Sequence, residues 1–113
     1  MFDSVTSVGM RNALDALMAR QEVIADNVSN INTPGYLARR VSFEDSMARA
    51  VHSGGGDFSA REHRSLEPTR LDGNNVNLEW ETLSNIDTGL RYQLALRSVD
   101  GEFAKLRTAM RTN

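Results

Sequence analysis

The fold of this chain is decided by residues 25–36, which read ADNVSNINTPGY and end a long run of helical sequence. Proline cannot continue a helix, and Pro34 also pushes Thr33 toward an extended backbone. The pair Pro34-Gly35 fits the two central positions of a type II turn. These residues therefore predict a helix that ends near Asn30 and a sharp corner after it.

Upstream of the corner, apolar residues recur at the 4-3-4-3-4-3 spacing of a heptad seam. A glutamine fills the one place in this spacing that is not apolar. The pattern predicts an N-terminal helix over residues 4–31 that packs through this seam. The candidate seam consists of Met10, Leu14, Leu17, Gln21, Ile24, Val28 and Ile31.

The corner is also rich in asparagine. An ordinary helix end needs only one Asn or Gly followed by Pro, because few groups are required to satisfy the last carbonyls. The surplus favours a corner that is held in one conformation or that touches a partner, over a plain stop signal. The candidate corner residues are Asn27, Asn30, Thr33, Pro34, Gly35 and Tyr36.

A second turn signal, Asp72, Gly73 and Asn74, precedes the other long periodic segment. Apolar residues then follow at heptad spacing, with a slip of one place after Leu90. A helix over residues 79–111 would be roughly 45 to 50 Å long at 1.5 Å per residue. Its candidate seam consists of Leu83, Ile86, Leu90, Tyr92, Leu96, Val99, Phe103, Leu106 and Met110.

Residues 32–78 form a corner, loop and turn region that is polar and charge-balanced, with a brief alternation at Val41 and Phe43. We expect one mostly α domain over residues 1–113. Two long terminal helices form a coiled-coil-like hairpin, joined by a polar, partly irregular middle that can include a short β stretch. Such helices have more apolar edge than one hairpin buries, so we expect the chain to associate with copies of itself.

Composition excludes several classes of protein. The net charge is −2 with both signs mixed along the chain, so we expect no nucleic-acid partner. The absence of cysteine excludes disulfides and thiolate metal sites. No conventional secretory signal begins at Met1, and no apolar run approaches the length of about 18 residues that a membrane span needs. We expect no cofactor and no direct membrane span.

Few residues suit catalysis or metal binding. His52 and His63 lie on either side of a glycine-rich break where nothing holds them in place, so surface histidines are the better interpretation. Glu79 and Glu81 flank Trp80, but acid–base catalysis by such a pair needs a surrounding pocket. Solvated helix faces are favoured over a small hydrolase, and no catalytic or metal-binding residue is assigned.

Residues 25–36 closely resemble the N-terminal signature of the axial proteins of the bacterial flagellum, the rod and hook group. In that group a long helix carrying Asn-x-x-Asn runs into Thr-Pro-Gly-Tyr. Residues 72–79 (DGNNVNLE), 90–93 (LRYQ) and 103–110 (FAKLRTAM) are similar to the turn and C-terminal helix of its proximal rod members.

The resemblance implies a non-enzymatic structural subunit of the basal body, in the proximal part of the periplasmic rod. Such a subunit is expected to assemble with copies of itself and with other rod proteins into the drive shaft that transmits torque and forms the export channel. It is expected to leave the cytoplasm by the flagellar type III export apparatus without a cleaved signal peptide, and to contact the adaptor protein between the membrane ring and the rod. The alternative, from the heptads alone, is a cytoplasmic coiled-coil adaptor or export chaperone.

Overall fold

The computed structural model describes residues 5–111, with all side chains in that range except those of residues 5, 6, 102, 103 and 106. Residue 4, the expected start of the first helix, lies outside the described residues. The elements in order are α1 (Val5–Ser29), β1 (Arg39–Ser42), α2 (Glu44–His52), β2 (Arg61–Arg64) and α3 (Leu78–Arg111).

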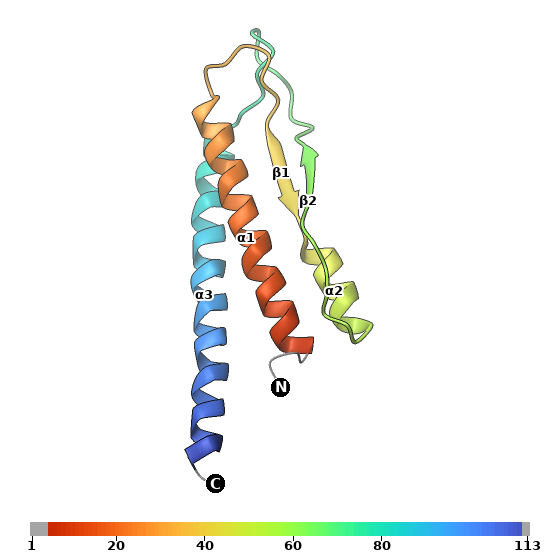
Figure 1. The fold of residues 1–113 in the computed structure, drawn as a ribbon. Coiled ribbons are helices and arrows are strands. Elements are labelled where there is room, and N and C mark those ends of the chain that lie inside the picture. The colour runs from red at the N-terminus through yellow and green to blue at the C-terminus, as the bar shows by residue number, and fades with distance from the viewer. Residues whose placement is uncertain (1–4, 112–113) are drawn as a thin grey trace.

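The two long helices, α1 and α3, run antiparallel side by side, while β1, α2 and β2 lie along the other flank of α1 (Figure 1). The described part of the chain extends over 67 × 25 × 15 Å along its principal axes. The expected mostly α fold, with two long terminal helices and a short β stretch between them, is confirmed.

The central element is α1, because it contacts α3 on one side and β1 and α2 on the other. Its buried apolar residues form two adjacent rows, Ala16 with Val23 and Leu17 with Ile24. A helix needs two such rows when neighbours cover more than one side of it. The other members of the expected seam are less buried: Met10, Leu14, Gln21 and Ile31 are half-buried, and Val28 is 40% exposed.

The middle of the chain folds onto α1. β1 pairs antiparallel with β2, and all four residues of β2 are exposed. Val41 and Phe43, by contrast, are buried. Phe43 stacks on Phe58 with 6.1 Å between ring centroids, and it joins Ala16 and Leu17 in the main apolar cluster. The polar middle therefore completes the core of α1, since alternate residues of an extended segment point to the same face.

The first part of α3 turns a polar face toward α1. Glu81 and Thr88 are fully buried there, at 1% and 0% exposure. Leu83, Ile86 and Leu90, expected as the start of the α3 seam, are 68%, 56% and 64% exposed and lie on the outward face. These three side chains therefore contribute little to the packing of α3 on α1.

The one-place slip after Leu90 corresponds to a change of face, because each residue of a helix turns by about 100°. Tyr92 and Val99 are half-buried, and Tyr92 packs against the main apolar cluster. Leu96 is 41% exposed and Met110 is 70% exposed. Two further members of the expected seam, the side chains of Phe103 and Leu106, lie outside the described residues.

Candidate functional site

The end of α1 forms the sharp corner that Pro34-Gly35 predicts. The Tyr36 backbone N–H donates to the carbonyl oxygen of Thr33 at 3.2 Å, and Gly35 has a φ of 76°. A positive φ at the third residue and a hydrogen bond between the first and fourth identify residues 33–36 as a type II turn. Pro34 and Gly35 are exposed at the end of the molecule.

Asn27, on the last turns of α1, joins the corner to β1 and α3. Its side chain is fully buried. The amide nitrogen donates to the Arg39 carbonyl oxygen at 2.7 Å and to Glu81 Oε1 at 2.9 Å. The amide oxygen accepts from the Tyr36 hydroxyl at 3.2 Å and from the Arg39 backbone N–H at 3.0 Å. All four hydrogen-bonding positions of the amide are used, which only Asn can do at this length of side chain.

Asn74, from the turn before α3, caps the end of α1. Its fully buried amide nitrogen lies 2.8, 3.1 and 2.9 Å from the carbonyl oxygens of Asn30, Ile31 and Thr33. Its amide oxygen accepts from the Val76 backbone N–H at 2.7 Å. These three carbonyls follow Ser29, the last residue of α1, and each also accepts from a second donor: the Thr33 N–H, the Arg70 guanidinium and the Tyr36 N–H, respectively. Asn74 therefore fixes the conformation of the turn that ends the helix.

Asn75 repeats this arrangement one residue later, on the side of β1. Its amide oxygen accepts from the Ala38 backbone N–H at 2.7 Å, and its amide nitrogen donates to the carbonyl oxygens of Ser65 and Glu67 at 3.3 and 3.0 Å. Its backbone N–H donates to the Tyr36 carbonyl oxygen at 3.2 Å. The role of Asn75 was not predicted, and its position directly after Asn74 is the signal that the sequence offers for it.

The remaining corner and turn residues hold the two loops against each other. Gly35 N–H donates to the Asp72 carbonyl oxygen at 2.8 Å, and Asp72 Oδ1 accepts from the backbone N–H of Asn74 at 3.0 Å. Gly73 has a φ of 85°, and a Cβ atom there would lie 3.3 Å from Gly35 Cα. Within the corner itself, Thr33 Oγ1 lies 3.0 Å from Asn30 Oδ1.

Glu81 corrects the expectation that this carboxylate lies on a solvated helix face. It is 1% exposed, and its Oε2 atom is buried with no hydrogen-bond partner. Burial raises the pKa of Glu81, which the Asn27 hydrogen bond and the charge of Arg40 only partly offset, while Glu67 adds to the increase. Arg40 itself lies 3.7 Å from the Trp80 ring centroid and 3.4 Å from Glu67. Neighbouring Glu79 stays exposed, because residues two apart lie on different sides of a helix.

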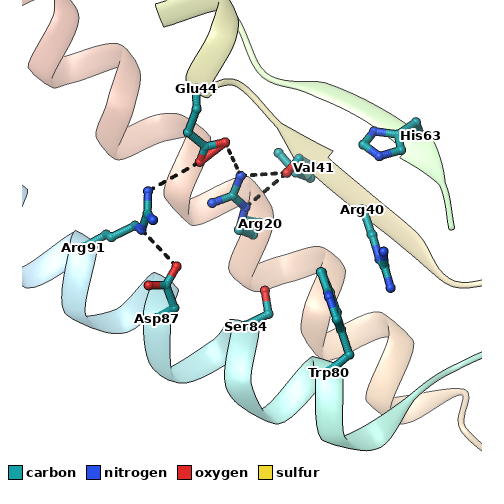
Figure 2. A pocket seen from close by; sticks show the side chains of 9 residues that line it. All are labelled: Arg20, Arg40, Val41, Glu44, His63, Trp80, Ser84, Asp87 and Arg91. Atoms are coloured by element: carbon teal, nitrogen blue, oxygen red, sulfur yellow. Dashed lines mark hydrogen bonds and ion pairs between the residues drawn. The ribbon is translucent and has the colours of Figure 1, made fainter.

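A cavity of about 370 Å³ lies between α1, the β1–α2 segment and α3 (Figure 2). Its walls carry a chain of ion pairs. Arg20 donates to the Val41 carbonyl oxygen and pairs with Glu44 at 2.7 Å; Arg91 lies 3.8 Å from Glu44 and 2.9 Å from Asp87. Burial acts to raise the pKa of Glu44, but the Arg20 hydrogen bond and charge outweigh it and the pKa is lowered. The cavity is therefore bordered by paired charges that link α1, α2 and α3.

Among the described residues, no group of three or more His, Asp or Glu side chains is placed to hold a metal ion. His63 lies on β2, with its Nδ1 atom 3.2 Å from Ser42 Oγ. No helix within residues 5–111 has the length and apolar character needed to cross a membrane.

The sequence was also compared with known protein families and with individual proteins. Residues 10–36, which cover most of α1 and the corner, match the family described as "Flagella basal body rod protein". The flagellar basal body rod protein FlgB of Bacillus subtilis (strain 168) is 30% identical over 95% of this chain and 94% of its own length. FlgB of Borrelia hermsii is 31% identical over 72% of this chain and 77% of its own, and FlgB of Escherichia coli (strain K12) is 27% identical over 81% and 83%.

Proposed function

This chain belongs to the FlgB family of flagellar basal body rod proteins, and from that premise we propose which of its surfaces build the rod. It is a structural subunit of the basal-body rod and not an enzyme. Its family assembles with other flagellar rod components. Family membership does not support the alternative of a cytoplasmic coiled-coil adaptor or export chaperone.

The outward face of α3 is the assembly surface that the geometry supports best. Four large apolar side chains line it at spacings of three and four residues, and each is between 56% and 68% exposed: Leu83, Ile86, Leu90 and Leu94. Burying one such side chain contributes about 1.5 to 3 kcal/mol. This apolar row is the single observation that carries the proposal, because none of the elements within residues 5–111 covers it.

On α1 the corresponding surface is smaller. Met18 is 50% exposed and Val28 is 40% exposed. A groove of about 470 Å³ at the α1–α3 contact is lined by Met18, Gln21, Gly89 and Tyr92 among others. The proposed α1 surface thus combines Val28 of the seam with Met18, which lies outside the seam, while Leu17 and Ile24 of the seam are buried and hold the subunit together.

The corner gives the subunit a defined shape. The buried side chains of Asn27, Asn74 and Asn75 together connect α1, β1, α3 and the loop before α3 through hydrogen bonds. A shaft that transmits torque needs subunits whose elements keep their relative angles, and buried amide networks impose such angles. We assign this positioning role to Asn27, Asn30, Thr33, Pro34, Gly35, Tyr36 and the turn of Asp72, Gly73 and Asn74.

The partners, location and export route that we propose for the subunit also follow from its membership of the FlgB family. The proposed partners are copies of the chain, other rod proteins and the adaptor between the membrane ring and the rod. The proposed site is the periplasmic rod, where the assembled helices surround the export channel. The chain reaches it through the flagellar type III export apparatus without a cleaved signal peptide.

Purified basal bodies provide the test. Basal bodies extracted with detergent from cells that express the chain are analysed by mass spectrometry, beside the soluble cytoplasmic fraction of the same cells. The chain should be enriched in the basal bodies, and the cells should lose motility when it is deleted. Recovery of the chain in the cytoplasmic fraction alone would contradict the assignment.

A further inference from the structure

The two-stranded sheet has one edge that is covered and one that is open. On the β1 edge, the Arg39 N–H and carbonyl oxygen bond to the Asn27 side chain at 3.0 and 2.7 Å, and the Val41 carbonyl oxygen accepts from Arg20 Nη2 at 2.8 Å. These two side chains of α1 take up the backbone groups that a further strand would need. Figure 1 shows β1 between α1 and β2, so the opposite edge of the sheet belongs to β2.

The outward edge of β2 is formed by the backbone of Glu62 and Arg64. The Ser65 N–H donates to the Ala38 carbonyl oxygen at 2.8 Å, so these two residues form a hydrogen-bonded pair that continues the β1–β2 register. Such pairs alternate along an antiparallel ladder, and the residues between them direct their N–H and C=O groups away from the partner strand. Within residues 5–111, no hydrogen bond from another element or loop reaches the backbone of Glu62 or Arg64. β2 therefore offers free donors and acceptors to a further strand.

The side chains along this edge carry an excess of positive charge. Arg61 and Arg64 are exposed, and among the described residues neither has an ion pair or a side-chain hydrogen bond. Glu62, the one acidic residue of β2, pairs with Arg39, which also pairs with Asp26 at 2.7 Å. The guanidinium groups of Arg61 and Arg64 therefore have no carboxylate beside them.

We infer that β2 binds an extended acidic segment of a partner protein, which joins the sheet as a third strand. Backbone hydrogen bonds to Glu62 and Arg64 supply affinity, and the side chains of the added strand supply specificity. Residues three apart in a strand point to opposite faces, so Arg61 and Arg64 select a segment with acidic side chains three residues apart. The inference goes beyond the proposed rod function, because β2 lies on the flank of α1 away from α3 and its outward apolar row (Figure 1).

Two synthetic peptides probe the edge of the purified full chain by titration calorimetry. Both are short, capped at both ends and rich in threonine and valine; one carries two glutamates three residues apart, and the other carries lysines there. The glutamate peptide should bind about tenfold more tightly, because opposite-charge pairs stabilise the added strand and like-charge pairs destabilise it. It should also slow hydrogen exchange at the amides of Glu62 and Arg64, measured by NMR. Equal affinities, binding by neither peptide, or protection at another element would overturn the inference.

A matched pair of variants separates the backbone edge from the charge of Glu62. Glu62→Pro removes the outward N–H, a loss that an edge strand tolerates, whereas Glu62→Ala removes the same carboxylate and keeps the N–H. Glu62→Pro should bind the glutamate peptide about tenfold more weakly than Glu62→Ala, because one acceptor of the peptide is left unpaired. Equal binding by the two variants would show that the peptide does not join the sheet.

Reversal of the charges tests the edge without proline. Arg61→Glu with Arg64→Glu should prefer the lysine peptide, while Arg61→Lys with Arg64→Lys should keep the preference of the parent. Retention of the parent's preference by the first of these variants would contradict the inference. Association of the parent with itself in the absence of peptide, lost in Glu62→Pro, would assign the edge to a second copy and likewise overturn the acidic partner. All these measurements use purified protein, so absence of the chain from basal bodies would contradict the rod function alone.

Discussion

Asn27 of α1 and Glu81 of α3 are 54 residues apart in the sequence, and a buried 2.9 Å hydrogen bond from Asn27 Nδ2 to Glu81 Oε1 joins them. The other carboxylate oxygen, Oε2, has no partner, although it is buried. A buried carboxylate with one unpaired oxygen disfavours its own ionised form. The contact that joins the two long helices is therefore sensitive to protonation.

The first prediction concerns pH. Because the pKa of Glu81 is raised in the folded chain, the folded state binds this proton more tightly than the unfolded state, whose value is about 4.3. The Glu81 contribution to stability is present below the unfolded pKa and is lost as pH rises through the folded pKa. Glu81→Gln keeps the hydrogen bond to Asn27 and carries no charge, so the variant should gain stability relative to the parent across that window and keep the gain above it.

Chemical denaturation at a series of pH values measures this difference. The lowered pKa of Glu44 has the opposite pH dependence, with stability lost on acidification, but it is common to both proteins and cancels in the comparison. Parallel stability curves for the parent and Glu81→Gln at all pH values would show that Glu81 is not the titrating group.

The second prediction concerns the cap on α1. Asn74→Ala empties the place of a fully buried side chain, and it removes both the donor within 3.1 Å of three carbonyl oxygens and the acceptor of the Val76 N–H. The free energy of unfolding should fall by about 2 to 4 kcal/mol, measured by urea denaturation. Asn32→Ala is the matched control, since Asn32 is an exposed asparagine of the same corner and should change stability by less than about 0.5 kcal/mol. Equal effects of the two substitutions would contradict the capping role.

The third prediction concerns the turn before α3. Gly73→Ala puts a Cβ 3.3 Å from Gly35 Cα at a φ of 85°, so unfolding should become easier by about 1 to 2 kcal/mol. Gly101→Ala adds the same methyl group to a helical residue with open space around it, and should stabilise α3 by about 0.5 to 1 kcal/mol. Thermal unfolding of both variants checks the opposite signs; a stabilised Gly73→Ala would mean that the loops are not in close contact.

The fourth prediction separates the core from the assembly surface. Leu17 is 3% exposed, so Leu17→Ala should destabilise the chain by about 2 to 5 kcal/mol. Leu83→Ser combined with Leu90→Ser changes two outward side chains and should cost less than about 1 kcal/mol of stability, yet abolish recovery in basal bodies and motility. Calorimetry and basal-body extraction together make the test. A motile strain that carries the double serine variant would exclude the outward face of α3 from assembly.

Much of this protein could be predicted from local sequence. Helix periodicity and turn geometry depend on residues that are close together in the chain. The two long helices, the corner at Pro34-Gly35 and the turn at Asp72 could therefore be predicted from the sequence. The same residues carried the resemblance to flagellar axial proteins. The assembly seams were expected from the excess of apolar residues, and they remain a proposal.

The tertiary structure alone decided which faces meet. A heptad pattern shows that one stripe is apolar without saying which stripe packs inside the subunit, and in α3 Leu83 and Leu90 lie outward while Glu81 and Thr88 lie inward. Asn74 caps a helix that ends more than 40 residues earlier, and Asn27 reaches a carboxylate on the other long helix. Such contacts depend on how the two helices are aligned along each other, and no local rule of sequence contains that alignment.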